Sequence, residues 1–226
     1  MGEKKKKEER SKRIKQVLVI GACVIFVVLM VASAMGSGWI TGLAPIKAGD
    51  TVVLDYTLYN ANGRAIVTSD QQLWKTGAAN GLLLSKQLSI VANQSIGQNL
   101  TPVYVYDSQS GNWNTQIAFH RSEMAAITQG VIGMKDNDKK TIGLPMQLTV
   151  VYGAPELAEN HLNISEIVTG ELFPLGESET PSDSAANETG PVYLRIGDVV
   201  SVNPQNVTVD TSYPKMDVTI YTVNGR

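Results

Sequence analysis

No charged side chain occurs between Val17 and Gly38, where the sequence reads VLVIGACVIFVVLMVASAMGSG. A helix needs about 20 mainly apolar residues to cross a hydrocarbon core of roughly 30 Å. Such a helix also pairs its own backbone groups, which the lack of water inside a bilayer requires. Trp39 follows directly and suits the headgroup region. The sequence therefore predicts a transmembrane helix at residues 17–38.

Charge is distributed unevenly along the chain. Residues 1–16 contain eight of the 19 Lys and Arg residues but only three of the 21 Asp and Glu residues. A basic segment beside a membrane span stays in the cytoplasm and is attracted to anionic lipid. We therefore expect a cytoplasmic tail at 1–16 and an extracytoplasmic main body. An acidic body of this kind argues against a nucleic-acid partner.

An alternative interpretation of this N-terminal region stays open. Ala32-Ser33-Ala34 resembles a signal-peptidase site, so residues 1–34 could instead be a removable signal peptide. Acceptors of the N-x-S/T type agree with an exterior body and lie at Asn93, Asn99, Asn163, Asn187 and Asn206.

Cysteine and histidine are scarce in this chain. A single cysteine, Cys23, excludes internal disulfides and Cys-rich zinc sites. The two histidines, His120 and His161, lack the close spacing of a catalytic metal motif. We expect neither a metal nor any other cofactor.

Hydrophobic patterning after Lys47 predicts an α+β body dominated by antiparallel sheet. Thr51–Asn60 alternates and leads through an Asn62-Gly63 turn into Ala65–Thr68, which predicts a hairpin. Ser122–Gln129 predicts a short helix, and 176–190, acidic and poor in apolar residues, predicts a loop. Further strands are predicted at 102–106, 115–119, 139–144, 147–152, 192–196, 199–203, 207–210 and 217–223.

Five segments resemble, in order, those of FKBP-type peptidylprolyl isomerases. Ile46–Tyr56 (IKAGDTVVLDY) resembles the opening strand of that family, and Asn62–Ser69 (NGRAIVTS) resembles its D-G-x-x-F-D-x-S turn. Gln129–Leu144 (QGVIGMKDNDKKTIGL) is similar to its G-x-x-G-M run, Val151–Gly153 to its A-Y-G, and Met216–Val223 to its closing strand. The resemblance implies an antiparallel half-barrel sheet around a short helix.

The resemblance also implies how the chain is divided into domains. An FKBP-like domain would comprise 48–156 and 209–226, with 70–119 as a long insertion. The chain between the Y-G motif and the closing strand resembles the SlyD-like branch, in which a chaperone domain replaces the flap. Asn163–Val168, Val192–Asp210 and the Asp210–Pro214 return carry this likeness. It implies a β-rich insert-in-flap domain at 157–208.

The resemblance implies a prolyl-binding pocket as well. Rotation about an X–Pro bond crosses a barrier of roughly 18–20 kcal/mol. An apolar pocket stabilises the twisted amide relative to the planar one. The implied catalytic residues are Tyr152, matching the flap tyrosine that holds the substrate carbonyl, and Tyr56, matching a wall tyrosine. The implied substrate-binding residues are Ile66, Val67, Ile127, Val131, Met134 and Met216.

Four of these positions depart from the family pattern. Ile66 and Val67 stand where the family has Phe and Asp, Ile127 replaces the floor aromatic, and Met216 replaces an aromatic of the last strand. An apolar hollow would survive these changes, but its aromatic contacts and its carboxylate would not. These aliphatic side chains can equally be ordinary core residues.

Two further sets of side chains are candidates for polypeptide binding. In the insert, we expect clients to bind Ile164, Ile167, Val168, Leu172 and Phe173. In the 70–119 insertion, the aromatics either bind extended polypeptide or anchor loops; they are Trp74, Tyr104, Tyr106 and Trp113.

These features lead to a functional hypothesis with two alternatives. The leading hypothesis is a membrane-anchored extracytoplasmic folding factor that binds unfolded or Pro-containing exported proteins and isomerises prolyl bonds. The second is a non-catalytic FKBP-like chaperone or accessory subunit of a membrane complex. The third, an adhesive surface domain, is disfavoured by the order of FKBP-like motifs.

Overall fold

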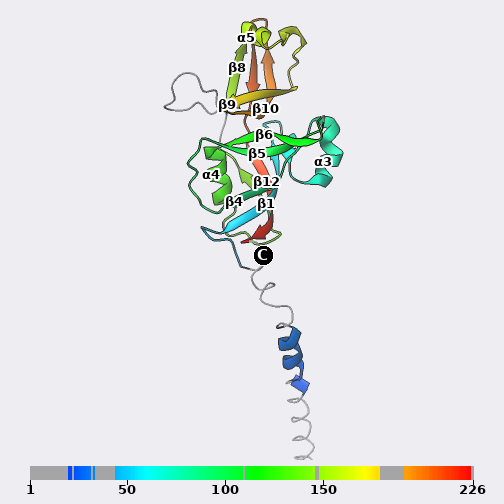
Figure 1. Cartoon of the computed structure of the whole chain (residues 1–226), viewed down its shortest axis with the longest axis vertical. Coiled ribbons are helices and arrows are strands. Elements are labelled where there is room, and N and C mark those ends of the chain that lie inside the picture. Colours follow the sequence, from blue (N-terminus) through cyan, green and yellow to red (C-terminus); the bar gives the residue numbers. More distant parts are fainter. Residues whose placement is uncertain are drawn as a thin grey trace, which may run out of the picture. The chain divides into compact units, whose positions relative to one another are not determined.

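The computed structural model describes residues 20–21, 23–31, 33, 44–108, 110–145, 148–178 and 191–224 (Figure 1). The chain divides into two units, Met1–Ala44 with Arg226, and Pro45–Gly225. Within the ranges given, no helix combines the length and apolar character needed to cross a bilayer. The predicted tail at 1–16 and part of the predicted span at 17–38 lie outside those ranges.

The unit Pro45–Gly225 has the α+β fold that the sequence predicts, with two sheets that are mostly antiparallel and include the parallel pairs β2–β3 and β6–β10. Sheet A has the order β3-β2-β1-β12-β7, with β4 also paired to β1. Its strands are β1 (Thr51–Tyr59), β2 (Ala65–Thr68), β3 (Leu83–Leu84), β4 (Leu88–Val91), β7 (Lys139–Gly143) and β12 (Lys215–Val223).

Sheet B has the order β5-β6-β10-β11-β8, with β9 also paired to β10. Its strands are β5 (Leu100–Asp107), β6 (Asn112–His120), β8 (Thr149–Gly153), β9 (Leu172–Ser178), β10 (Val192–Val202) and β11 (Asn206–Asp210). The helices of the unit are α3 (Gln71–Gly77), η1 (Ala78–Asn80), α4 (Arg121–Gly130), α5 (Ala154–Glu159) and η2 (Ile164–Glu166).

Several predicted elements are confirmed. The β1–β2 hairpin forms, and its turn holds Gly63 at a φ of 76°, a conformation that favours glycine. The predicted helix is α4, where Glu123 Oε2 accepts a hydrogen bond of 2.8 Å from His120 N–H and so caps the first turn.

Helix α3 was not predicted; Asp70 caps it by accepting hydrogen bonds from Gln72 N and Leu73 N. The loop predicted at 176–190 is wrong for residues 176–178, which belong to β9, and 179–190 lies outside the described residues.

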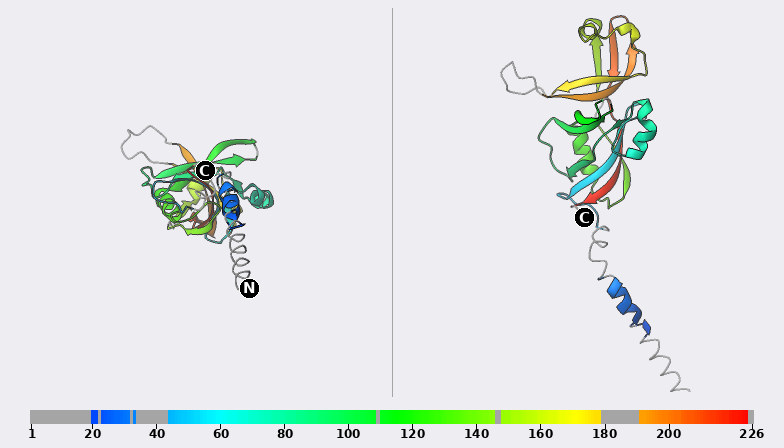
Figure 2. Two further views of the ribbon diagram at one scale, coloured as in Figure 1. Left: turned by 90° about the horizontal axis from the view of Figure 1, so that it is seen from below. Right: turned by 45° about the vertical axis from the view of Figure 1, so that its right-hand side comes forward.

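The main core lies between the inner face of sheet A, helix α4 and the β5–β6 hairpin (Figures 1 and 2). Every second residue of β1 points inward, so Val52, Leu54, Tyr56 and Leu58 are buried together. A second, smaller core lies within sheet B and contains Leu157, Phe173, Leu175, Val199, Val207 and Val209.

The β5–β6 hairpin, within residues 70–119, is part of the main core. Phe119 of β6 is fully buried, and its ring meets the ring of Tyr56 edge-on with 5.8 Å between centroids. On its other side, β6 pairs in parallel with β10 through Ile117 and Leu194. The hairpin therefore packs on the inner face of sheet A and pairs with β10, which follows β7 in the chain.

Phe119→Ala should lower the free energy of unfolding by about 3–5 kcal/mol, because it empties a ring-sized volume in the main core. Urea denaturation of the two proteins followed by circular dichroism measures this. Tyr104→Ala is the matched control on the same hairpin, where the side chain is exposed and the cost should be small. Equal costs for the two variants would contradict the packing described.

Candidate functional site: a closed hollow and a buried polar network

The side chains predicted to form a prolyl pocket are packed inside the main core. Exposure is 0% for Ile66, Val67, Ile127, Val131 and Met216, 2% for Tyr56 and 6% for Met134. The structure thus brings together every pocket position except Tyr152. With the hairpin in place, none of these side chains has surface with which to contact a substrate. Burial raises the pKa of the Tyr56 hydroxyl far above its ordinary value.

Tyr152 lies apart from this group. It belongs to β8, pairs with Val207 of β11, and packs against the second core, where its ring lies 5.9 Å from that of Phe173. Burial, followed by the negative charges of Glu156 and Glu177, raises the pKa of its hydroxyl. Its strand register, which depends on β11 more than fifty residues away in the chain, could not be read from the Y-G motif alone.

The residues predicted to bind clients in the insert fall into three environments. Phe173 is buried in the second core, and Ile164 and Ile167 are half-buried against it. Leu172 packs instead against the main core. Val168 is 57% exposed and is the one member of this set with a largely free surface.

Strand β8 forms the end of sheet B and has an open edge. Thr211 N–H donates to the carbonyl of Leu148, and Ala154 N–H donates to the carbonyl of Gln205, each over 2.8 Å. Backbone groups alternate in direction along an antiparallel ladder, so Val151, midway between these bonds, turns its N–H and C=O away from β11. Among the strands that the structure describes, none pairs with this outer edge. The Val151 side chain is 57% exposed.

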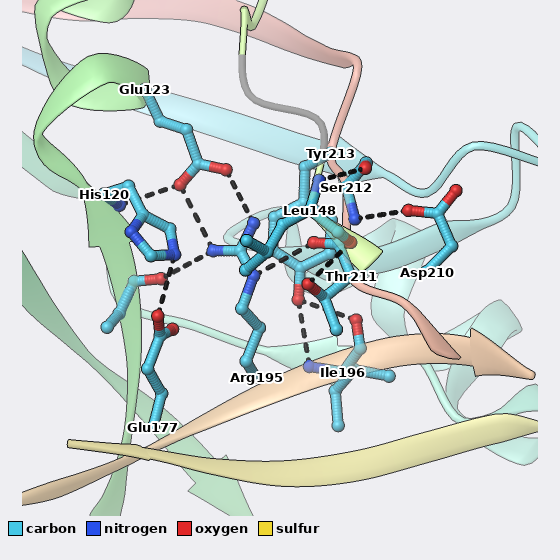
Figure 3. Close-up of polar contacts among 11 residues, drawn as sticks. His120, Glu123, Leu148, Glu177, Arg195, Ile196, Asp210, Thr211, Ser212 and Tyr213 are labelled. Atoms are coloured by element: carbon cyan, nitrogen blue, oxygen red, sulfur yellow. Dashed lines mark hydrogen bonds and ion pairs between the residues drawn. The ribbon is translucent and has the colours of Figure 1, made fainter. Parts of the chain in front are cut away.

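A buried polar network lies where sheet B meets helix α4 (Figure 3). Arg195 of β10 forms a two-pronged ion pair with Glu123 of α4, with contacts of 2.7 Å to Oε1 and 3.3 Å to Oε2. Its Nε donates to the Thr211 carbonyl over 2.9 Å, and its Nη1 lies 3.5 Å from the Ala118 carbonyl. Both charged side chains are almost fully buried. Burial lowers the pKa of Arg195, but the hydrogen bond and charge of Glu123 outweigh it and leave that pKa above its ordinary value.

Tyr213 completes the network. Its ring lies under the Arg195 guanidinium, 4.3 Å from centroid to Cζ, and its hydroxyl accepts from Ile196 N–H and donates to the Ile196 carbonyl. Burial raises the pKa of this hydroxyl to about 12. At the edge of the network, His120 Nε2 lies 2.9 Å from a carboxylate oxygen of Glu177 on β9. These contacts are all made to the protein itself, so they stabilise the junction between sheet B, α4 and the 211–213 segment.

Sequence reasoning missed this network. The signal was present, since Arg195 is a lone charge in the apolar run Val192–Ile196. A charge at such a position must find a buried partner, but the sequence does not reveal that the partner is Glu123.

A second buried carboxylate belongs to Asp198, which is 2% exposed. It stands opposite Asp210 in the β10–β11 ladder, and its Oδ2 makes no hydrogen bond within the described part of the chain. Burial raises the pKa of Asp198; nearby Asn60 and Arg64 lower it and Asp210 raises it further. In the described ranges, no group of three or more His, Cys, Asp and Glu side chains is arranged to hold a metal ion.

Comparison with known proteins adds no assignment to this geometry: the sequence matches no protein-family model and no curated protein.

Arg195→Met should destabilise the protein by about 3–5 kcal/mol, because it leaves the Glu123 carboxylate buried without its counter-charge. Urea denaturation measures the loss. The double variant Arg195→Met/Glu123→Gln should recover part of it, since the amide removes the buried charge and can still accept from His120 N–H. Arg121→Met is the control on an exposed arginine. A double variant less stable than Arg195→Met would contradict this account of the pair.

Asp198→Asn should raise the unfolding midpoint at pH 7. The folded-state pKa of Asp198 lies above the ordinary value of 3.8, so its charged form is disfavoured in the folded protein. The resulting loss of stability is fully present at a pH above the pKa of Asp198 in the folded protein. It vanishes as the pH falls below the pKa of Asp198 in the unfolded protein. The advantage of the variant should therefore shrink between pH 7 and pH 4 in thermal unfolding. An advantage that grows on acidification would contradict the assignment.

Proposed function

We propose that this chain is an FKBP-like folding factor that holds extended polypeptide segments at the edge of β8 and has little or no prolyl isomerase activity. Its clients are unfolded or Pro-containing exported proteins. The observation that carries the proposal is that the side chains of the implied prolyl pocket are packed in the main core, while the edge of β8 is open.

The architecture supports the FKBP-like part of the proposal. The strands that the resemblance assigns to the family sheet, β2, β1, β12 and β7, are neighbours in sheet A, and α4 packs on their inner face. Strands β8, β9, β10 and β11 lie between β7 and β12 in the chain. That order agrees with an insert in the flap.

Burial favours the non-catalytic form of the hypothesis over the isomerase. A substrate proline would have to displace the β5–β6 hairpin, including the Phe119 ring that meets Tyr56. Displacing the hairpin would expose buried apolar side chains to water, which costs about 25 cal/mol for each Å² of apolar surface exposed. Tyr152, the implied donor to the substrate carbonyl, packs in the other core.

The open edge supplies a means of holding an unfolded client. An extended segment that adds to β8 gains backbone hydrogen bonds without any sequence requirement. Val151 on that edge is 57% exposed and can contact apolar client side chains. The uncharged segment 17–38 and the basic tail support a membrane anchor with this body outside the cytoplasm.

The catalytic part of the proposal is tested on the full chain in detergent, with a proline-containing tetrapeptide and an unfolded protein as substrates. We expect no acceleration of peptide isomerisation, but suppression of aggregation of the unfolded protein. Strong isomerase activity lost in Tyr152→Phe would contradict the proposal and favour the enzyme.

Val151→Pro tests the holding site. The outward N–H of Val151 is not used in the β8–β11 ladder, so proline should leave sheet B folded while removing the central donor of the edge. We expect suppression of aggregation to fall several-fold. Val151→Thr is the matched control, because it keeps the N–H and the β-branched shape, and it should retain the activity. Full activity in Val151→Pro, with unchanged circular dichroism, would exclude the β8 edge.

Membrane topology is tested by reversing the charge of the basic tail. Changing Lys4, Lys5, Lys6 and Lys7 together to Glu should lower the fraction of chains inserted with the body outside, because the positive charge sets orientation. Protease added to intact cells should cut the wild type within 177–186. Protection of that segment in intact cells would contradict the outward assignment.

A further inference from the structure

We propose that the hollow on the outer face of sheet A is a binding site for a neutral oligosaccharide. This proposal is independent of the proposed polypeptide-holding function, because the hollow has its floor on sheet A whereas the proposed holding edge, β8, belongs to sheet B. Besides strands of sheet A, it is lined by residues of α3, of the 84–87 segment and of β6.

The hollow has a volume of about 830 Å³. Outward-facing residues of the sheet form its floor, namely Val53 and Asp55 of β1, Thr219 of β12 and Lys139 of β7. Residues 84–87 and the start of α3 form its walls, and Trp113 lies at its rim. A site of this size accommodates several sugar rings and is open to solvent.

A carboxylate is held in place on the floor. Asp55 Oδ1 accepts hydrogen bonds from Ser69 Oγ over 2.9 Å and from Gln87 Nε2 over 3.1 Å. Because both bonds use Oδ1, Oδ2 stays available to a ligand in the described structure. An oriented carboxylate with a neighbouring amide is suited to vicinal hydroxyl groups, which need an acceptor and a donor side by side.

An ammonium group and an aromatic ring lie beside this carboxylate. Lys86 Nζ lies 5.6 Å from the ring centre of Trp113 and 5.3 Å from that of Tyr104. Lys86 lines the hollow, and among the described residues no ion pair joins it to a carboxylate. Trp113 is itself supported by Tyr106, with 5.5 Å between ring centres. A supported indole offers an apolar surface for the C–H face of a pyranose ring.

The charges of the hollow favour a neutral ligand. Asp55 and Asp70 balance Lys86 and Lys139, which disfavours strongly anionic or cationic partners. Nine of its twelve lining residues are polar or charged, and the three apolar ones are Val53, Leu84 and Trp113, which leaves few positions to anchor an unfolded peptide. Hydroxyl-rich sugars fit this combination better than an extended apolar polypeptide does.

The test is isothermal titration of the full chain, in a detergent without a sugar headgroup, with cellohexaose, maltohexaose and chitohexaose. We expect saturable binding of at least one of these neutral hexasaccharides. Trp113→Ala should weaken it by about tenfold through loss of ring stacking. Lys86→Met, which keeps the aliphatic stem but removes the donor, should weaken it several-fold.

Trp74→Ala is the matched control, since Trp74 contacts Tyr106 from α3 but does not line the hollow, and it should leave the affinity unchanged. Unchanged urea midpoints establish that the variants fold. The proposal is overturned if none of the three sugars binds, or if binding is the same in Trp113→Ala and the wild type. Binding of an extended peptide that Trp113→Ala abolishes would overturn it in favour of a polypeptide site.

Discussion

The buried ion pair of Arg195 and Glu123 connects parts of the chain that are distant in sequence. The Arg195 guanidinium forms an ion pair with Glu123 of α4, the helix that packs on sheet A. It also donates to the Thr211 carbonyl, in the segment that leads into β12, and lies 3.5 Å from the Ala118 carbonyl of the β5–β6 hairpin. A buried charge pair is costly to desolvate, so it contributes more to fixing one arrangement than to net stability. Here it connects β10 with α4 and with the segment that leads into β12.

Closure by the hairpin gives a physical reason for the departures from the FKBP pattern. Once the hairpin covers the inner face of sheet A, side chains there need only fill volume, and Ile66, Val67 and Ile127 do so at zero exposure. A carboxylate at Val67 would be buried without a counter-charge, which is strongly unfavourable. The aliphatic side chains at these positions and the β5–β6 hairpin therefore form parts of one packed core.

Local patterns predicted much of the fold, and long-range contacts account for what they missed. Alternation in Thr51–Tyr59 and the capped helix after His120 depend on neighbours in sequence, so both could be predicted. The arrangement of the candidate site could not be predicted from local patterns. Tyr152 matched a family motif, yet its position depends on pairing with β11, and the Arg195–Glu123 pair spans 72 residues. The closing of the hollow could not be predicted either, because nothing in the sequence of β6 indicates that Phe119 meets Tyr56.

The most direct test of a closed hollow uses the methyl group of Met216, which is fully buried at its centre. With ¹³C-methyl methionine labelling, the Met216 resonance can be assigned by substitution and followed while a soluble nitroxide or a proline-containing peptide is added. This account predicts no paramagnetic broadening and no peptide-dependent shift of that resonance. Broadening by the nitroxide together with a saturable shift on peptide addition would show that the hollow opens to substrate, and would contradict it.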